Sequence, residues 1–147
     1  MTRTIYINGG DFGKPFIRKV IALTKKTSPR ICFLPTAGAD SPYAINWWYE
    51  LCQDLPMKAY VQRVFLNSSP EQKTFEENLL GMDAIVVGGG STLNMMAIWK
   101  AQGIDTVLKK AYQKGMPVTI MPACYSKTKN TSSLLPPARW IISIMCP

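Results

Sequence analysis

Residues 84–96 carry the residue types and spacing that best suit chemistry on an anion. A short aliphatic run, three consecutive glycines, a Ser-Thr pair and a helical apolar pattern predict a strand, a tight turn and a helix. Backbone N–H groups at the start of such a helix carry partial positive charge and suit a carboxylate, a phosphate or a reaction oxyanion. A connection without a ligand is the alternative, since glycine-rich turns are common in α/β folds. The candidate binding residues are Gly88, Gly89, Gly90, Ser91 and Thr92.

Two standard phosphate-binding motifs do not fit the sequence. The dinucleotide fingerprint fails because Leu93 stands where its third glycine would be. A phosphate loop at residues 9–15 is one residue short, and Pro15 replaces the hydroxyl that would hold magnesium. The sequence therefore argues against nucleotide hydrolysis.

Histidine is absent from all 147 residues, which removes the usual general base at neutral pH and the commonest metal ligand. The four cysteines, at positions 32, 52, 124 and 146, show no Cys-x-x-Cys spacing. We expect Cys32 and Cys52 to be buried reduced thiols, which favours a cytoplasmic location. We expect no metal and no other cofactor.

Composition indicates one globular domain, with 47% apolar and 18% charged residues. The formal charge of +8 comes from 17 basic and 9 acidic residues, but the basic residues are scattered. A solvated surface is favoured over a specific nucleic-acid face. With no apolar signal-peptide core and no apolar run of about 18 residues, we expect no membrane association.

Predicted strands and helices alternate along the chain. Strands are expected at residues 4–7, 31–34, 60–66, 84–87 and 116–121, each followed by a turn. Helices are expected to begin at Pro15, after a Ser41 cap, at a Ser69–Gln72 capping box, after the glycine turn and at an Asp105 cap. In the helix after the glycines, Leu93, Met96, Ala97 and then Trp99 or Lys100 are expected to pack inward. This order predicts a three-layer α/β/α sandwich with a mainly parallel sheet.

Three segments of the sequence together resemble the S51 serine peptidases, the family of dipeptidase E and cyanophycinase. They are residues 5–10 (IYINGG), 33–37 (FLPTA) and 87–94 (VGGGSTLN), and the match extends over about residues 4–118. The resemblance implies a class I glutamine amidotransferase-like, or flavodoxin-like, sandwich. It also implies that a backbone N–H near Gly88 to Gly90 helps to form an oxyanion hole, and that small peptides or carboxylates are the ligands.

The sequence departs from the family where the nucleophilic serine is expected, in a Gly-x-Ser-Ala-Gly turn. Counting from Gly115 places that serine at Pro122, with Ile120 and Cys124 in place of the two glycines. Proline offers no nucleophile, and no histidine is present to activate a neighbouring hydroxyl. We therefore expect a C-terminally truncated or frameshifted S51 peptidase that is inactive. A noncatalytic module that binds small anions is the alternative, and an exposed sheet edge would favour homo-oligomers.

The last 26 residues, 122–147, form an atypical tail after the α/β domain of residues 1–121. They contain basic residues but no acidic ones, and no helix caps or amphipathic period. If codons 121–126 are read two bases later, they can encode Ala-Gly followed by an aliphatic residue, which is what should follow the family serine. We therefore hypothesise that the tail is translated out of frame.

Overall fold

A five-stranded parallel sheet organises the chain. The computed structural model describes residues 3–7, 13–65 and 74–120. The strands are β1 (Ile5–Ile7), β2 (Arg30–Leu34), β3 (Lys58–Val61), β4 (Ala84–Val87) and β5 (Val118–Ile120), in the spatial order β1-β5-β4-β2-β3. All four strand pairings are parallel. The predicted tail (122–147) and the Ser69–Gln72 capping box lie outside the described residues.

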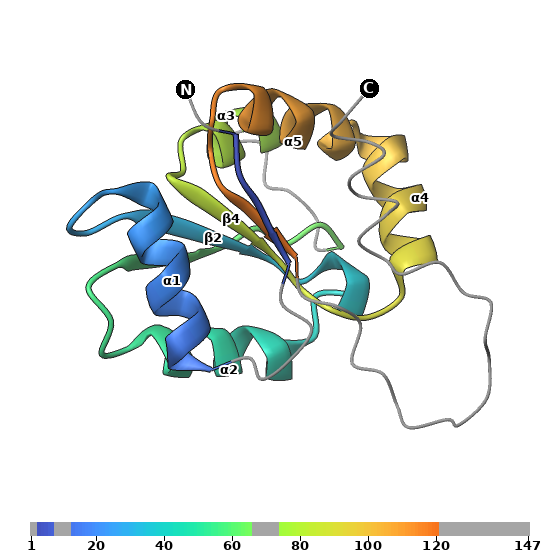
Figure 1. Cartoon of the computed structure of the whole chain (residues 1–147). Helices are drawn as coiled ribbons and strands as arrows, with labels where there is room; N and C mark the ends of the chain where they lie inside the picture. The colour runs from blue at the N-terminus through green and yellow to red at the C-terminus, as the bar shows by residue number, and fades with distance from the viewer. Residues whose placement is uncertain (1–2, 8–12, 66–73, 121–147) are drawn as a thin grey trace, which may run out of the picture.

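Helices cover both faces of this sheet (Figure 1). One face carries α1 (Lys14–Thr24) and α2 (Pro42–Cys52), and the other carries α3 (Phe75–Leu80), α4 (Thr92–Gln102) and α5 (Ile104–Gln113). Alternate residues of a strand point to opposite faces, so β4 gives Ile85 and Val87 to one core and Ala84 and Val86 to the other. The predicted three-layer α/β/α fold with a parallel sheet is confirmed.

The helix after the glycines buries only part of the predicted face: Trp99 packs inward and Met96 is partly buried, as predicted, but Leu93 and Ala97 are not buried. Leu93 is 80% exposed and Ala97 is also exposed, while Met95 and Trp99 are buried. Almost every position of α4 near Trp99 is apolar, so the sequence period does not select one face. Contact with the sheet and α5 selects it instead.

Two other boundaries differ from the prediction. The third strand ends at Val61 rather than at residue 66, because the N–H groups of Val64 and Phe65 donate to the Asp40 carboxylate instead of to a strand. Asp105 lies in the first turn of α5 and does not cap it; Gly103 holds the cap position.

The other caps also need correction. Ser41 precedes α2, but its hydroxyl makes no capping hydrogen bond. A complete capping box is formed by Thr74 and Glu77 at the start of α3, where each side chain bonds the other residue's N–H. This Thr-x-x-Glu signal was present in the sequence beside the predicted Ser69–Gln72 box.

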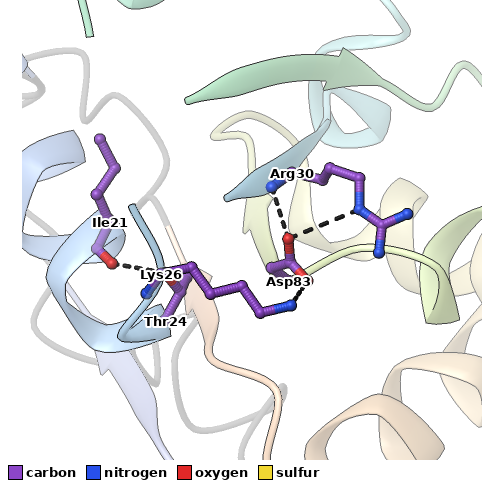
Figure 2. A network of polar contacts seen from close by, with 5 residues as sticks. All are labelled: Ile21, Thr24, Lys26, Arg30 and Asp83. Carbon is purple, nitrogen blue, oxygen red and sulfur yellow. Dashed lines mark hydrogen bonds and ion pairs between the residues drawn. The ribbon is translucent and has the colours of Figure 1, made fainter. Parts of the chain in front are cut away.

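A network of polar contacts around Asp83 links β2 and β4 at the end of the sheet where both strands begin (Figure 2). The Asp83 side chain is 10% exposed; its carboxylate accepts from Lys26 Nζ at 2.7 Å and from the Arg30 N–H at 2.7 Å. Burial alone would raise the pKa of this carboxyl. The hydrogen bonds from Arg30 and Lys26 and their positive charges outweigh burial and lower the pKa below its usual value.

Replacing Asp83 by Asn is expected to lower the free energy of unfolding by about 1–2 kcal/mol at pH 7. A lowered pKa in the folded state stabilises the fold above the ordinary Asp pKa of about 4, and this stabilisation is lost as the pH falls through the folded value. Urea unfolding should therefore show a difference in the free energy of unfolding between the wild-type protein and Asp83→Asn that is smaller near pH 2.5 than at pH 7. Asp54→Asn is the control, because the Asp54–Lys14 pair is exposed and contributes little. An equal loss at both pH values would contradict the prediction.

Candidate functional site

The glycine turn lies where two neighbouring strands send the chain to opposite faces of the sheet. From β2 the chain passes through η1 (Thr36–Gly38) to α2, and from β4 it passes through the glycines to α4 on the other face (Figure 1). Open α/β sheets bind ligands outside the carboxyl ends of their strands at such a switch point. The topology therefore places the predicted binding residues where a ligand is expected.

The glycine turn is bonded directly to the loop after β2. The Gly88 N–H donates to the Leu34 carbonyl at 2.8 Å, and the Ser91 N–H donates to the Ala37 carbonyl at 2.8 Å. Gly90 has a φ of 144°, and a Cβ at this position would lie 2.1 Å from the Ala37 carbonyl oxygen. The close approach of the two loops therefore requires glycine at position 90.

Two N–H groups of the turn, those of Gly89 and Gly90, are candidate donors to a ligand. Within the part of the chain that the structure describes, neither Gly89 nor Gly90 donates a backbone hydrogen bond. The N–H groups of Thr92 and Leu93, in the first turn of α4, also donate no backbone hydrogen bond to a described residue, as is usual for the first N–H groups of a helix. Gly88 differs, because its N–H is taken by Leu34. The turn thus offers unbonded donors beside the positive end of an 11-residue helix.

Ser91 and Thr92 serve the helix itself. The Ser91 hydroxyl accepts from the Asn94 N–H at 3.4 Å and caps α4, and Thr92 is the first helical residue. Since the sequence contains no histidine, the usual partner that activates a serine hydroxyl is missing. Their place in the turn is compatible with anion binding, which stays a prediction, and the Pro122 position lies outside the described residues.

The sequence did not indicate the two residues, Thr36 and Asp40, that connect the loop after β2 to its neighbours beside the glycine turn. Thr36 is buried, and its hydroxyl accepts from the Trp99 indole N–H at 3.1 Å, which links η1 to α4. Asp40 is also buried and connects the same loop to the segment after β3. A polar residue in a loop is an ordinary sequence feature, so only the fold reveals that these two are enclosed.

Both described cysteines are buried, as predicted, and neither lies in the glycine turn. Cys32 is on β2 and Cys52 ends α2. Burial raises the pKa of each thiol to about 12, partly offset at Cys32 by a backbone hydrogen bond. A thiol with such a pKa is almost entirely protonated at neutral pH and is a poor nucleophile.

In a Cys124→Ser/Cys146→Ser variant, Cys32 and Cys52 are expected to react with a disulfide reagent at pH 8 on the order of a thousandfold more slowly than a free thiol. The reason is their small thiolate fraction together with their burial. Absorbance of the released thiol measures the rate, and unfolding in guanidinium should restore fast reaction of both. Fast reaction of either thiol in the folded protein would contradict the assignment.

The described ranges contain neither a candidate metal site nor a candidate membrane span. Across residues 3–7, 13–65 and 74–120, no group of three His, Cys, Asp or Glu side chains is arranged to hold a metal ion. No helix in those ranges is both long enough and apolar enough to span a membrane.

Comparison with known proteins gives a consistent result. A sequence profile of peptidase family S51 matches residues 7–121. The uncharacterized peptidase YgaJ of Bacillus subtilis (strain 168) is 32% identical in an alignment 144 residues long, and this alignment covers 92% of the present chain.

Two crystal structures share the fold. A candidate peptidase E protein from Listeria monocytogenes EGD-e superposes with a TM-score of 0.61 at 16% identity, over 81% of this chain. A peptidase from an acI-B1 actinobacterium superposes with a TM-score of 0.63 at 17% identity, over 80% of this chain. The matched region spans 61% of YgaJ and 58% and 52% of the two crystallised chains.

Proposed function

Because this chain belongs to peptidase family S51, we propose that its glycine turn is the oxyanion-binding part of a serine-type, dipeptidase E-like exopeptidase site for small peptides. The observation that carries the proposal is that the Gly89 and Gly90 N–H groups, at the switch point of the sheet, donate no backbone hydrogen bond to any described residue. The loop after β2 fixes the turn from behind, so the donors are held in place before a ligand arrives.

Such a turn suits the chemistry of peptide hydrolysis through an acyl-enzyme. When a serine oxygen attacks the peptide carbonyl, the carbonyl oxygen gains negative charge, and fixed N–H donors stabilise it. Loss of one donor in such a site typically costs about 10²–10³ in kcat. The same donors can hold the carboxylate of a small peptide in the ground state.

The 147 residues are proposed to bind such an anion without hydrolysing a peptide. Position 122, where the resemblance places the nucleophile, is proline, and the sequence contains no histidine. Incubation with an Asp-containing dipeptide should release no amino acid above background. Turnover that a serine-directed reagent abolishes would overturn this part of the proposal.

Anion binding is tested with acetate as the probe. In a titration followed by ¹H–¹⁵N spectra, the Gly89 and Gly90 amide resonances are expected to shift with saturation. Thr92→Pro removes one N–H at the first helical position, where proline is tolerated, and should weaken binding. Thr92→Ala is the matched control, because it changes the side chain and keeps the N–H. Acetate-induced shifts that avoid the turn would contradict the proposal.

A noncatalytic anion-binding module is the second candidate function. It is favoured by the combination of unbonded turn donors with the absence of histidine. Inorganic phosphate that competes with acetate at the turn, where a small peptide does not compete, would favour this candidate over the peptidase site. We further propose that the protein is cytoplasmic and that it self-associates through a sheet edge. Sedimentation measures the self-association.

A further inference from the structure

We infer that Asp40 is a positioning residue for the glycine turn and acts on it through the loop after β2. This inference rests on the proposed function, because it concerns the conformation of the N–H groups that would bind the anion. Asp40 does not belong to the turn and lies 50 positions before Gly90 in the sequence.

The first step is the contact between Asp40 and the chain after β3. The Asp40 side chain is enclosed, with the residue 7% exposed. Its Oδ2 atom accepts from the backbone N–H of Val64 and from that of Phe65, the latter at 2.8 Å. Two consecutive N–H groups that lack a strand partner are thus satisfied by one carboxylate oxygen.

The second step joins Asp40 to η1. The Asp40 N–H donates to the Pro35 carbonyl at 3.2 Å, and the Ala39 N–H donates to the Thr36 carbonyl at 3.0 Å. Ala39 and Asp40 both have positive φ, 55° and 54°, a conformation that costs free energy for residues other than glycine. The carboxylate contact holds the loop in this closed form.

The third step joins η1 to the turn. The Ala37 carbonyl accepts from the Ser91 N–H and leaves no room for a side chain at Gly90. The Thr36 hydroxyl accepts from the indole N–H of Trp99, about two turns further along α4. A shift of residues 36–38 would therefore move Ser91 and Trp99, and with Ser91 the adjoining turn that carries the Gly89 and Gly90 N–H groups.

The chemistry of Asp40 favours a positioning role over simple packing. Its second oxygen, Oδ1, is buried and has no hydrogen-bond partner among the described residues. An enclosed side-chain oxygen that accepts two backbone N–H groups fixes the loop by directional bonds, which apolar packing would not supply. These bonds and the two strained residues, Ala39 and Asp40, occur together in the loop that abuts the turn.

The test compares Asp40→Gly with Asp40→Asn. Glycine removes the carboxylate and suits a φ of 54°, whereas Asn keeps an acceptor oxygen and tolerates this conformation. Asp83→Gly is the control, because it removes the carboxylate that accepts a backbone N–H at the opposite end of the sheet. Amide hydrogen exchange and ¹H–¹⁵N spectra are recorded without any anion.

In Asp40→Gly, exchange of the Ser91 N–H is expected to accelerate about tenfold or more relative to Asp83→Gly. The Gly89, Gly90 and Trp99 indole resonances should move as well, while Asp40→Asn stays close to the wild-type protein. Equal Ser91 exchange in Asp40→Gly and Asp83→Gly, with unmoved turn resonances, would overturn the inference.

If Asp40→Gly does not fold, the wild-type protein decides the question through native-state exchange in low urea. The Val64, Phe65 and Ser91 amides are expected to exchange through one common opening. Exchange of Ser91 while Val64 and Phe65 stay protected would overturn the inference. Since no anion is present, failure of acetate to bind the turn would count against the proposed function and leave this result unaffected.

Discussion

Gly90→Ala is expected to lower the free energy of unfolding by about 3 kcal/mol or more, or to displace the turn from the η1 loop. The added Cβ would lie 2.1 Å from the Ala37 carbonyl oxygen, 2.4 Å from its carbon and 2.8 Å from the Gly38 nitrogen. These are backbone atoms, which cannot rotate away as a flexible side chain can. A φ of 144° is itself a conformation that alanine rarely adopts. Urea unfolding measures the loss.

Gly103→Ala is the matched control for this substitution. Gly103 also has positive φ, at 72°, but a Cβ there would meet no atom within 4 Å. Replacing Gly103 by alanine should lower the free energy of unfolding by about 1–2 kcal/mol, which is the cost of a left-handed backbone conformation alone. Similar losses for the two variants would show that contact with Ala37 does not determine the need for glycine at position 90. In Gly90→Ala protein that stays folded, acetate binding at the turn should be lost.

Trp99→Ala is expected to lower the free energy of unfolding by about 3–5 kcal/mol. The Trp99 side chain is 1% exposed and packs from α4 into the core that this helix forms with the sheet and α5. Its removal would leave a large cavity and would also deprive the Thr36 hydroxyl of the indole N–H that it accepts at 3.1 Å. Chemical denaturation of the variant, with far-ultraviolet circular dichroism as the signal, measures the loss.

A double-mutant cycle separates the packing contribution of Trp99 from its hydrogen bond. Trp99→Phe keeps an aromatic ring and removes the N–H, and Thr36→Val removes the hydroxyl with little change in shape. Each single variant leaves one buried polar group unsatisfied and should cost about 1–3 kcal/mol. The double variant should cost about 1 kcal/mol less than their sum. Strict additivity would indicate that the indole–hydroxyl bond contributes nothing to the contact between η1 and α4.

Local patterns in the sequence were sufficient for the architecture. The all-aliphatic run at Ala84–Val87 predicted a strand buried on both faces, and both faces are covered by helices. Pro15 and Gly103 marked a helix start and a helix end because proline and glycine act through their own backbone restrictions. The resemblance to family S51 was likewise visible in three short segments, and the profile match over residues 7–121 confirms it.

The face of α4 could not be predicted in the same way. Leu93 and Trp99 are both apolar residues of one helix, yet Leu93 is 80% exposed and Trp99 is 1% exposed. Hydrophobic periodicity identifies a face only when polar residues mark the opposite one. The environment of Trp99, including its bond to Thr36, arises from strands and loops distant in sequence.

The sequence alone determined the fold class, the family and the glycine turn, because strand, helix and turn preferences depend on residues close together in the chain. Tertiary structure alone decided which turn N–H groups are bonded within the described part of the chain, since Leu34 and Ala37 accept those of Gly88 and Ser91. It also decided that Gly90 faces a carbonyl and that Asp40 is enclosed. Each of these properties depends on distances between loops that parallel crossovers bring together, and such distances are set by packing of the whole sheet and not by local sequence.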